Sequence, residues 1–247
     1  MNGYALPIVT AVLAALFTAF GGALAAPGQR GGRLRALLLG ASAGAMLVFS
    51  LWRMVSEAVC RMTLLYGETA GGLLVFFGLL LGAAAAFLAG SGASRNRTAF
   101  SGLDVFTGMV LLLHNLPEGA SLFLEKSDQS ILASAIHNIP EGIAVGAAMR
   151  YAGRSRRAAL AAALLVGLSE PLGAVLAVAV LSPFLTLPAL CLLLCASAGM
   201  MACLALMGLF PAAAECGGRP LTLAGGFMGA ACAVLFSLFP ISALFGA

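Results

Sequence analysis

Charged side chains are scarce in this 247-residue chain. Asp, Glu, Lys and Arg together make up 9% of the residues, whereas hydrophobic residues make up 62%. A soluble domain carries about 25% charged residues. The composition therefore excludes a soluble globular protein and indicates an all-α, polytopic membrane protein.

Long polar stretches are also missing, so no soluble domain is expected and the whole chain, 1–247, is read as one transmembrane domain. A membrane-spanning helix needs about 20 consecutive apolar residues. The first apolar segment has no basic stretch before it, which favours a retained helix over a cleaved signal peptide. On the length rule the sequence predicts eight transmembrane helices: 5–26, 34–55, 70–90, 104–124, 130–149, 157–181, 185–210 and 221–244.

Basic residues are few and unevenly distributed among the connecting loops. Ten of the 13 lie after spans 1, 3, 5 and 7, and the other three are Arg53, Arg61 and Lys126. Because basic loops stay on the cytoplasmic side, this distribution predicts a multi-pass protein of the cell membrane with both termini outside the cytoplasm. The net charge of +4 follows from these loops and does not call for a nucleic-acid partner. The ten are Arg30, Arg33, Arg35, Arg95, Arg97, Arg150, Arg154, Arg156, Arg157 and Arg219.

Cysteines give no disulfide framework. Four of the six lie in apolar runs, and the other two lie in loops that the predicted topology places on opposite sides of the membrane. Inert packing of free thiols is therefore expected.

Histidine is rare, and its two copies occur in nearly identical motifs. His114 opens the word His-Asn-Leu-Pro-Glu-Gly at 114–119, and His137 opens His-Asn-Ile-Pro-Glu-Gly at 137–142. Each histidine has a glutamate four residues later, on the same face of a helix. Ionisable residues inside a membrane are costly and usually functional. Imidazole and carboxylate together form a ligand set for a divalent metal such as zinc.

The two words fall at similar depths in the membrane. At about 1.5 Å per residue, His114 lies about 16 Å from the outer end of its span and His137 about 10 Å from the outer end of the next. Both are therefore near the midplane of two adjacent antiparallel helices, where they can face each other. The glycine that closes each word, Gly119 or Gly142, would allow close helix contact.

A third acid adds to this set. Glu170, in Gly-Leu-Ser-Glu-Pro-Leu-Gly, is the remaining carboxylate well inside a predicted span. Three neighbouring carboxylates repel one another unless a cation lies among them. With the amides of Asn115 and Asn138, the ligands suffice for two metal ions, or for one ion in transit between two positions. A single histidine in an apolar helix is usually a hydrogen-bonded core residue, but two copies of one word at one depth favour a metal site.

A weak internal repeat links the two halves of the chain. The string at 41–46, Ala-Ser-Ala-Gly-Ala-Met, recurs at 196–201 as Ala-Ser-Ala-Gly-Met-Met, in a span of opposite direction. Inverted repeats around a central site are common in transporters, which suggests a 3+2+3 inverted-repeat arrangement. The alternative is that small-residue strings recur by chance where helices pack closely.

The motifs resemble those of the ZRT/IRT-like (ZIP) metal transporters, in particular the bacterial zinc-uptake branch. The two histidine words are similar to the family's signatures in spans 4 and 5, and the Glu170 segment is similar to its span 6 motif. The resemblance implies transport of Zn²⁺, and often of Fe²⁺, Mn²⁺ or Cd²⁺, toward the cytoplasm by an elevator-like motion. By the same resemblance the main metal site comprises His114, Glu118, His137 and Glu141, and an adjacent second site comprises Asn115, Asn138 and Glu170 with the shared Glu118 and Glu141.

The sequence also departs from the family pattern. Arg53 stands where an acid is common near the outer end of span 2, and Met207-Gly208 replaces an acidic pair at the inner end of span 7. The loop at 91–102, often rich in histidine in relatives, has none. An auxiliary metal relay at the entry or the exit therefore has no support.

Two alternatives remain beside a transporter. One is a metal sensor or non-conducting relative, which binds the ion without moving it. The other is an intramembrane metalloenzyme, which is disfavoured because His-Glu-x-x-His is absent and both glutamates serve as ligands. The protein is thus not expected to be an enzyme or to hold a prosthetic group. Its expected partners are the divalent ion, carried as substrate, and the lipid bilayer, with a homodimer left open.

Overall fold

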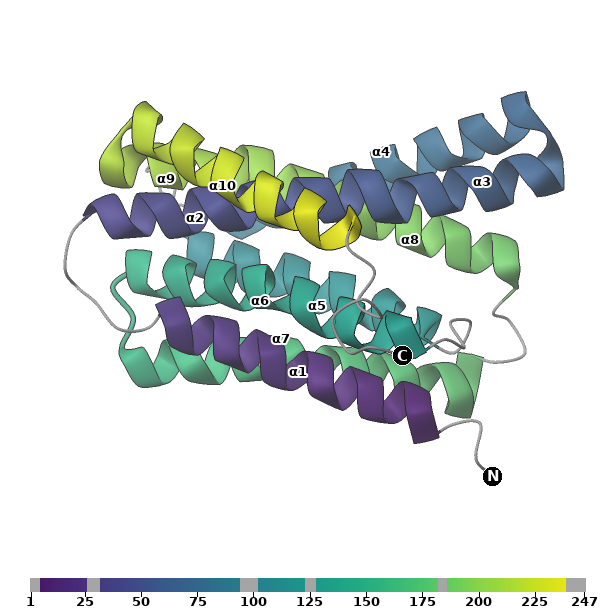
Figure 1. Ribbon diagram of the computed structural model, residues 1–247, viewed down its shortest axis with the longest axis horizontal. Coiled ribbons are helices and arrows are strands. Elements are labelled where there is room, and N and C mark those ends of the chain that lie inside the picture. The colour runs from purple at the N-terminus through teal and green to yellow at the C-terminus, as the bar shows by residue number, and fades with distance from the viewer. Residues whose placement is uncertain (1–4, 26–31, 94–101, 123–127, 182–185, 239–247) are drawn as a thin grey trace.

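The computed structural model describes residues 5–25, 32–93, 102–122, 128–181 and 186–238, and every regular element among them is a helix (Figure 1). Three short segments are π-helical and are labelled η. The elements are α1 (Ala5–Ala25), α2 (Gly32–Val48), η1 (Phe49–Met54), α3 (Val55–Tyr66), α4 (Glu68–Ala93), α5 (Leu103–Ser121), α6 (Asp128–Tyr151), α7 (Arg156–Leu176), η2 (Ala177–Leu181), α8 (Leu187–Cys203), η3 (Leu204–Leu209), α9 (Phe210–Gly217) and α10 (Arg219–Leu238).

Six helical stretches in the described residues are long and apolar enough to cross a membrane. They are Pro7–Ala25, Gly32–Tyr66, Glu68–Ser91, Arg156–Val180, Leu187–Gly217 and Arg219–Leu238. The two other helices of comparable length, α5 and α6, carry the histidine words and are not among these six stretches. The protein is therefore an all-helical membrane protein, with six rather than eight stretches that meet the criterion in the described residues.

Two helical stretches extend well beyond the predicted spans. The second span was predicted to end at 55, but α2, η1 and α3 continue without a break to Tyr66; the seventh was predicted to end at 210, but its helix continues to Gly217. Both stretches pass through a π-helical segment, η1 or η3. Each ends at a glycine of positive φ, Gly67 at 81° and Gly218 at 82°, a backbone conformation that terminates helices and that glycine adopts without strain.

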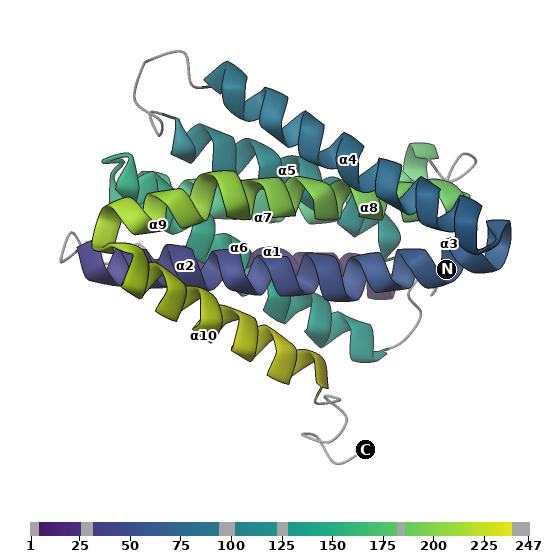
Figure 2. The ribbon, with the colours of Figure 1, turned by 90° about the horizontal axis from the view of Figure 1, so that it is seen from above.

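The helices form two groups that pack against each other (Figures 1 and 2). The four-helix bundle consists of α1, α5, α6 and α7. The outer layer consists of the other helices, in the order α10, α2–α3, α8–α9 and α4 when seen from above. Contacts between the groups are made mainly by α2 on α6 and by α8 on α5. The two helices that carry the histidine words thus lie at the boundary between the groups.

Glycines allow the helices of the bundle to touch backbone to backbone. A Cβ atom on Gly142 of α6 would lie 1.9 Å from the carbonyl oxygen of Thr18 in α1. A Cβ atom on Gly119 of α5 would likewise lie 1.9 Å from the carbonyl oxygen of Glu170 in α7. The expected close contacts at these glycines are confirmed, with α1 and α7 as the partner helices.

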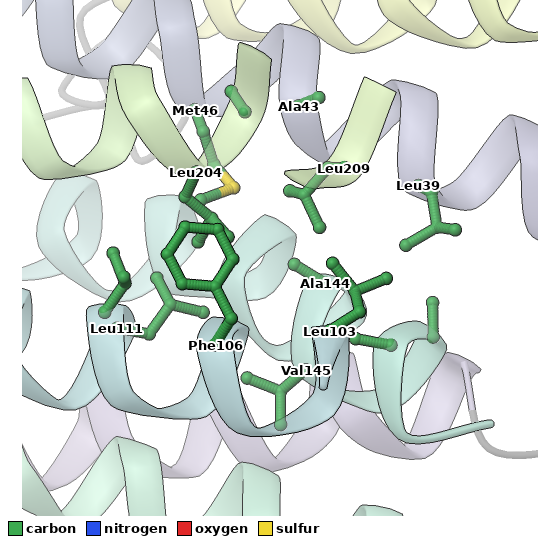
Figure 3. Packing of buried hydrophobic residues seen from close by; sticks show 14 of the residues in the cluster. Leu39, Ala43, Met46, Leu103, Phe106, Leu111, Ala144, Val145, Leu204 and Leu209 are labelled. Atoms are coloured by element: carbon green, nitrogen blue, oxygen red, sulfur yellow. The ribbon is translucent and has the colours of Figure 1, made fainter. Parts of the chain in front are cut away.

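A large hydrophobic cluster fills the boundary between the two groups on one side of the histidine words (Figure 3). Residues from α1, α2, α4, α5, α6, α7 and the α8–α9 stretch meet there, and most are fully buried. We call this set the apolar seal. Its labelled members in Figure 3 are Leu39, Ala43, Met46, Leu103, Phe106, Leu111, Ala144, Val145, Leu204 and Leu209.

Candidate metal site

His114, Glu118 and Glu141 bring three ligand atoms together where α5 faces α6. The Nε2 atom of His114 lies 3.3 Å from Oε2 of Glu118 and 3.3 Å from Oε1 of Glu141. Zinc binds nitrogen and oxygen ligands at about 2.1 Å, so two ligands of a tetrahedral ion are about 3.4 Å apart. The spacing of these side chains therefore matches the spacing of ligands around one zinc ion.

Several polar atoms of this cluster are buried without a hydrogen-bond partner. Within the described part of the chain, these atoms are Nδ1 of His114, Oε2 of Glu118 and both carboxylate oxygens of Glu141. Glu141 is only 1% exposed. Buried polar atoms are nearly always paired in folded proteins, and carboxylate oxygens attract cations. The cluster thus has the chemistry of a cation site.

His137 joins the cluster through Glu118. Its Nε2 atom lies 2.5 Å from Oε1 of Glu118, so that this carboxylate lies between the two histidines. The imidazole ring of His137 also contacts the ring of Phe49, with centroids 5.8 Å apart. The structure therefore gathers all four residues that were predicted to form the main site.

The three remaining predicted residues lie next to this cluster. The amide Nδ2 of Asn138 donates a hydrogen bond of 3.0 Å to Oε2 of the fully buried Glu170. Asn115 donates from Nδ2 to the carbonyl of Val166 at 3.2 Å, while its Oδ1 is buried without a hydrogen-bond partner in the described part. In this conformation Asn138 thus presents an N–H group, not an oxygen, to Glu170.

Two hydroxyl residues that the sequence analysis missed support these side chains. Thr18 of α1 donates to Oδ1 of Asn138 at 3.0 Å, and Ser197 of α8 donates to the carbonyl of His114 at 3.1 Å. Both hydroxyl residues are fully buried. Ser197 belongs to the repeated string at 196–201, which is a signal that could have drawn attention to it. Thr18 stands alone in an apolar segment, and its role depends on how α1 packs.

A cavity of about 50 Å³ connects the cluster to one side of the membrane domain. This volume holds a metal ion with a few water molecules, since one water occupies about 10–15 Å³ by this measure. The lining runs from the two histidines to Ser121 at the end of α5 and to Glu57 in α3. A smaller cavity beyond it is also lined by Glu57 and by Arg61. The cluster is therefore approached from this end, and the apolar seal occupies the other.

Glu57 stands at the wall of both cavities and pairs with Arg61 at 2.6 Å. This pair places one negative and one positive charge along the approach to the cluster. The side chain of Arg53, singled out from the sequence, lies outside the described part of the structure. Met207, one of the residues that depart from the family pattern, lies in η3 and is 53% exposed.

Fold and site together define a helical membrane protein with a buried imidazole–carboxylate centre that opens toward one side. Comparison with known proteins agrees with this class. A family model described as ZIP Zinc transporter matches residues 101–187, which include both histidine words and the Glu170 segment.

Similar proteins cover nearly the whole chain. A zinc transporter ZupT of Corynebacterium aurimucosum is 35% identical, over 92% of this chain and 95% of the relative. The ZupT proteins of Chlorobium luteolum and of Escherichia coli O1:K1 are 32% and 33% identical, over 91% and 85% of this chain and 94% and 87% of the relatives. The chain belongs to the ZIP family of zinc transporters.

Proposed function

We propose that this protein moves Zn²⁺ across the membrane toward the cytoplasm and that the buried cluster is its binding site. His114, Glu118, His137 and Glu141 hold the ion in this proposal. The observation that carries it is the pair of 3.3 Å separations around His114 Nε2, among carboxylate oxygens without hydrogen-bond partners. The similar proteins are named as zinc transporters, which supports the choice of ion. Fe²⁺, Mn²⁺ and Cd²⁺ suit the same ligand types and are candidates for slower substrates.

Asn115, Asn138 and Glu170 offer a second position for the ion, adjacent to the first. For Asn138 to be a ligand, its amide must rotate so that Oδ1 replaces Nδ2 beside Glu170. Thr18 suits either orientation, because a hydroxyl group both donates and accepts. This pair of positions supports a path in which the ion moves through the cluster rather than remaining in it.

The packing supports the eight-span, 3+2+3 arrangement in this proposal. In such a repeat α1, α2 and α4 correspond to α7, α8 and α10, and α5 corresponds to α6. The helix contacts agree with this correspondence. The pair α2 and α10 matches the pair α8 and α4, and the pair α1 and α6 matches the pair α7 and α5. With the basic loops in the cytoplasm, the cavity at Glu57 opens to the outside and both chain termini are extracytoplasmic.

Uptake into vesicles that contain the purified protein tests the proposal, with Zn²⁺, Fe²⁺, Mn²⁺ and Cd²⁺ offered singly and in competition. We expect saturable Zn²⁺ uptake that His114→Ala and Glu141→Ala each abolish. Thr107→Val is the matched control, since this buried α5 hydroxyl has no hydrogen-bond partner in the described part. Uptake at the wild-type rate by a folded double variant of His114 and Glu141 would refute the site.

A metal sensor is the second candidate, favoured by the loss of the family's acidic pair at Met207-Gly208. The two functions differ in one measurement. A sensor binds Zn²⁺ in equilibrium dialysis but shows no uptake above that of empty vesicles. A transporter shows both.

A further inference from the structure

The end of the protein opposite the cavity is closed by the apolar seal. Along α6, Glu141 of the cluster and Tyr151 at the helix end are ten residues apart, about 15 Å in a helix. Buried apolar residues such as Ala144 and Val145 fill this distance and meet Leu204 and Leu209 from the outer layer (Figure 3). An ion in the cluster therefore has no route to this end while the two groups of helices stay in contact.

At the edge of the seal a hydrogen bond joins the two groups. The Tyr151 hydroxyl, at the last residue of α6, donates to Oε2 of Glu215 in α9 at 2.5 Å. Tyr151 belongs to the four-helix bundle and Glu215 to the outer layer. Burial and the hydrogen bond to Glu215 raise the pKa of Tyr151, so the phenol keeps its proton and remains a donor at neutral pH.

A second polar contact at the same end provides a contrast. Arg154, just after α6, pairs through Nε with Asp104 in α5 at 2.8 Å. Both residues belong to the four-helix bundle. If the bundle moves relative to the outer layer, the Arg154–Asp104 pair moves as one piece, whereas the Tyr151–Glu215 hydrogen bond must break.

We propose that the hydrogen bond between Tyr151 and Glu215 is a latch that keeps this end of the protein closed. The latch holds the bundle against the outer layer, and its release lets the seal part so that the ion leaves. The inference that release of the latch lets the ion leave rests on the proposed transport function. Whether the contact holds the two groups together can be measured without any metal.

Native cysteines provide the means to measure opening. All six are free, as expected from the sequence. Cys203 is buried in the seal cluster, whereas Cys195 is fully buried in a separate cluster among α3, α4 and α8. Parting of the seal exposes Cys203 to water and leaves Cys195 covered, whereas general loosening exposes both.

The experiment measures the rate at which N-ethylmaleimide alkylates each cysteine in vesicles with the purified, zinc-free protein, with peptides quantified by mass spectrometry. In Tyr151→Phe we expect Cys203 to react about fivefold faster, the factor that one ordinary hydrogen bond contributes to an equilibrium. Glu215→Ala should give the same increase. The double variant should exceed neither single variant, because both remove one interaction.

The matched control is Asp104→Asn, which weakens a polar contact at the same end within one group. It should leave the rate at Cys203 unchanged. An unchanged Cys203 rate in Tyr151→Phe would overturn the latch, and so would equal acceleration at Cys195 and Cys203. A protein that fails to take up zinc but shows the expected alkylation would refute the transport function and leave the latch standing.

Discussion

Glu141→Gln isolates the contribution of one carboxylate to metal binding. Glutamine has nearly the same shape, so the packing of this fully buried side chain is kept. The change removes a negative charge whose two oxygens have no hydrogen-bond partner in the described residues. Glu170 cannot readily replace it, because its Oε2 accepts a hydrogen bond from Asn138. The variant should therefore bind zinc much more weakly.

The size of the effect follows from linkage. Loss of a residue that merely supports a metal ligand lowers affinity by about 10- to 100-fold, so loss of a ligand should lower it by at least about 100-fold. Zinc at 100 times the wild-type Kd stabilises the folded protein by about 2.7 kcal/mol. At the same concentration the Glu141→Gln protein gains at most about 0.4 kcal/mol. With about 2–4 °C per kcal/mol for a chain of this size, the zinc-induced rise in Tm should fall from about 5–10 °C to about 1 °C.

Buried thiols make this rise measurable in detergent solution. A thiol-reactive fluorescent dye reports unfolding when Cys191, Cys195 and Cys203 become exposed. Tm is measured with and without zinc for the wild type, for Glu141→Gln and for the control Thr107→Val, which should keep the full rise. A zinc-induced rise in Glu141→Gln equal to that of the wild type would show that Glu141 is not a ligand.

Three further outcomes are expected. The zinc-induced rise in Tm should shrink as the pH is lowered from about 7.5 to about 5.5, because imidazole and carboxylate ligands must lose their protons to bind metal; a rise that is constant over this range would contradict the ligand set. Gly142→Ala should sharply reduce the yield of folded protein, because its Cβ would lie 1.9 Å from the Thr18 carbonyl oxygen. Gly72→Ala in α4 should not, because no atom lies within 4 Å of its Cβ. Similar yields of the two variants would refute the close contact. Glu170→Gln should lower the uptake rate more than zinc affinity, and an unchanged rate would remove Glu170 from the path.

The histidine words made much of the site predictable. The spacing of His and Glu within a word is local and fixes a shared helix face. The two words lie in predicted neighbouring spans at one depth, so their meeting followed from span lengths alone. Glu170 was predicted to join them as the remaining carboxylate in a span, and it lies 3.0 Å from Asn138. That these residues bind metal stays a prediction.

The orientation of Asn138 could not be predicted, because it depends on a helix that is distant in sequence. Thr18 reaches the amide only because Gly142 lets α1 approach the backbone of α6. Nothing in the pattern around Thr18 distinguishes it from a threonine that faces lipid. The hydrogen bond between Tyr151 and Glu215 was missed for the same reason, since it joins residues 64 positions apart.

Helix ends were predicted less well than helix positions. A count of about 20 apolar residues places a span but says nothing of an amphipathic extension, and α3 and α9 are such extensions. Their true ends were marked by Gly67 and Gly218, which adopt positive φ. The two helices that carry the histidine words, α5 and α6, are not among the six described stretches that are long and apolar enough to cross a membrane.

The geometry of the cluster explains why one word is used twice. Because α5 and α6 are antiparallel, the glutamate lies nearer the Glu57 end of the cavity than its histidine in one word and farther from that end in the other. Each histidine therefore meets the glutamate of the opposite word: His114 lies 3.3 Å from Glu141, and His137 lies 2.5 Å from Glu118. Two parallel copies would instead have set histidine beside histidine and carboxylate beside carboxylate. An inverted pair of identical words alternates the ligand types around one point, which places the imidazole of His114 within 3.3 Å of both carboxylates and gives an arriving ion a mixed set of ligands.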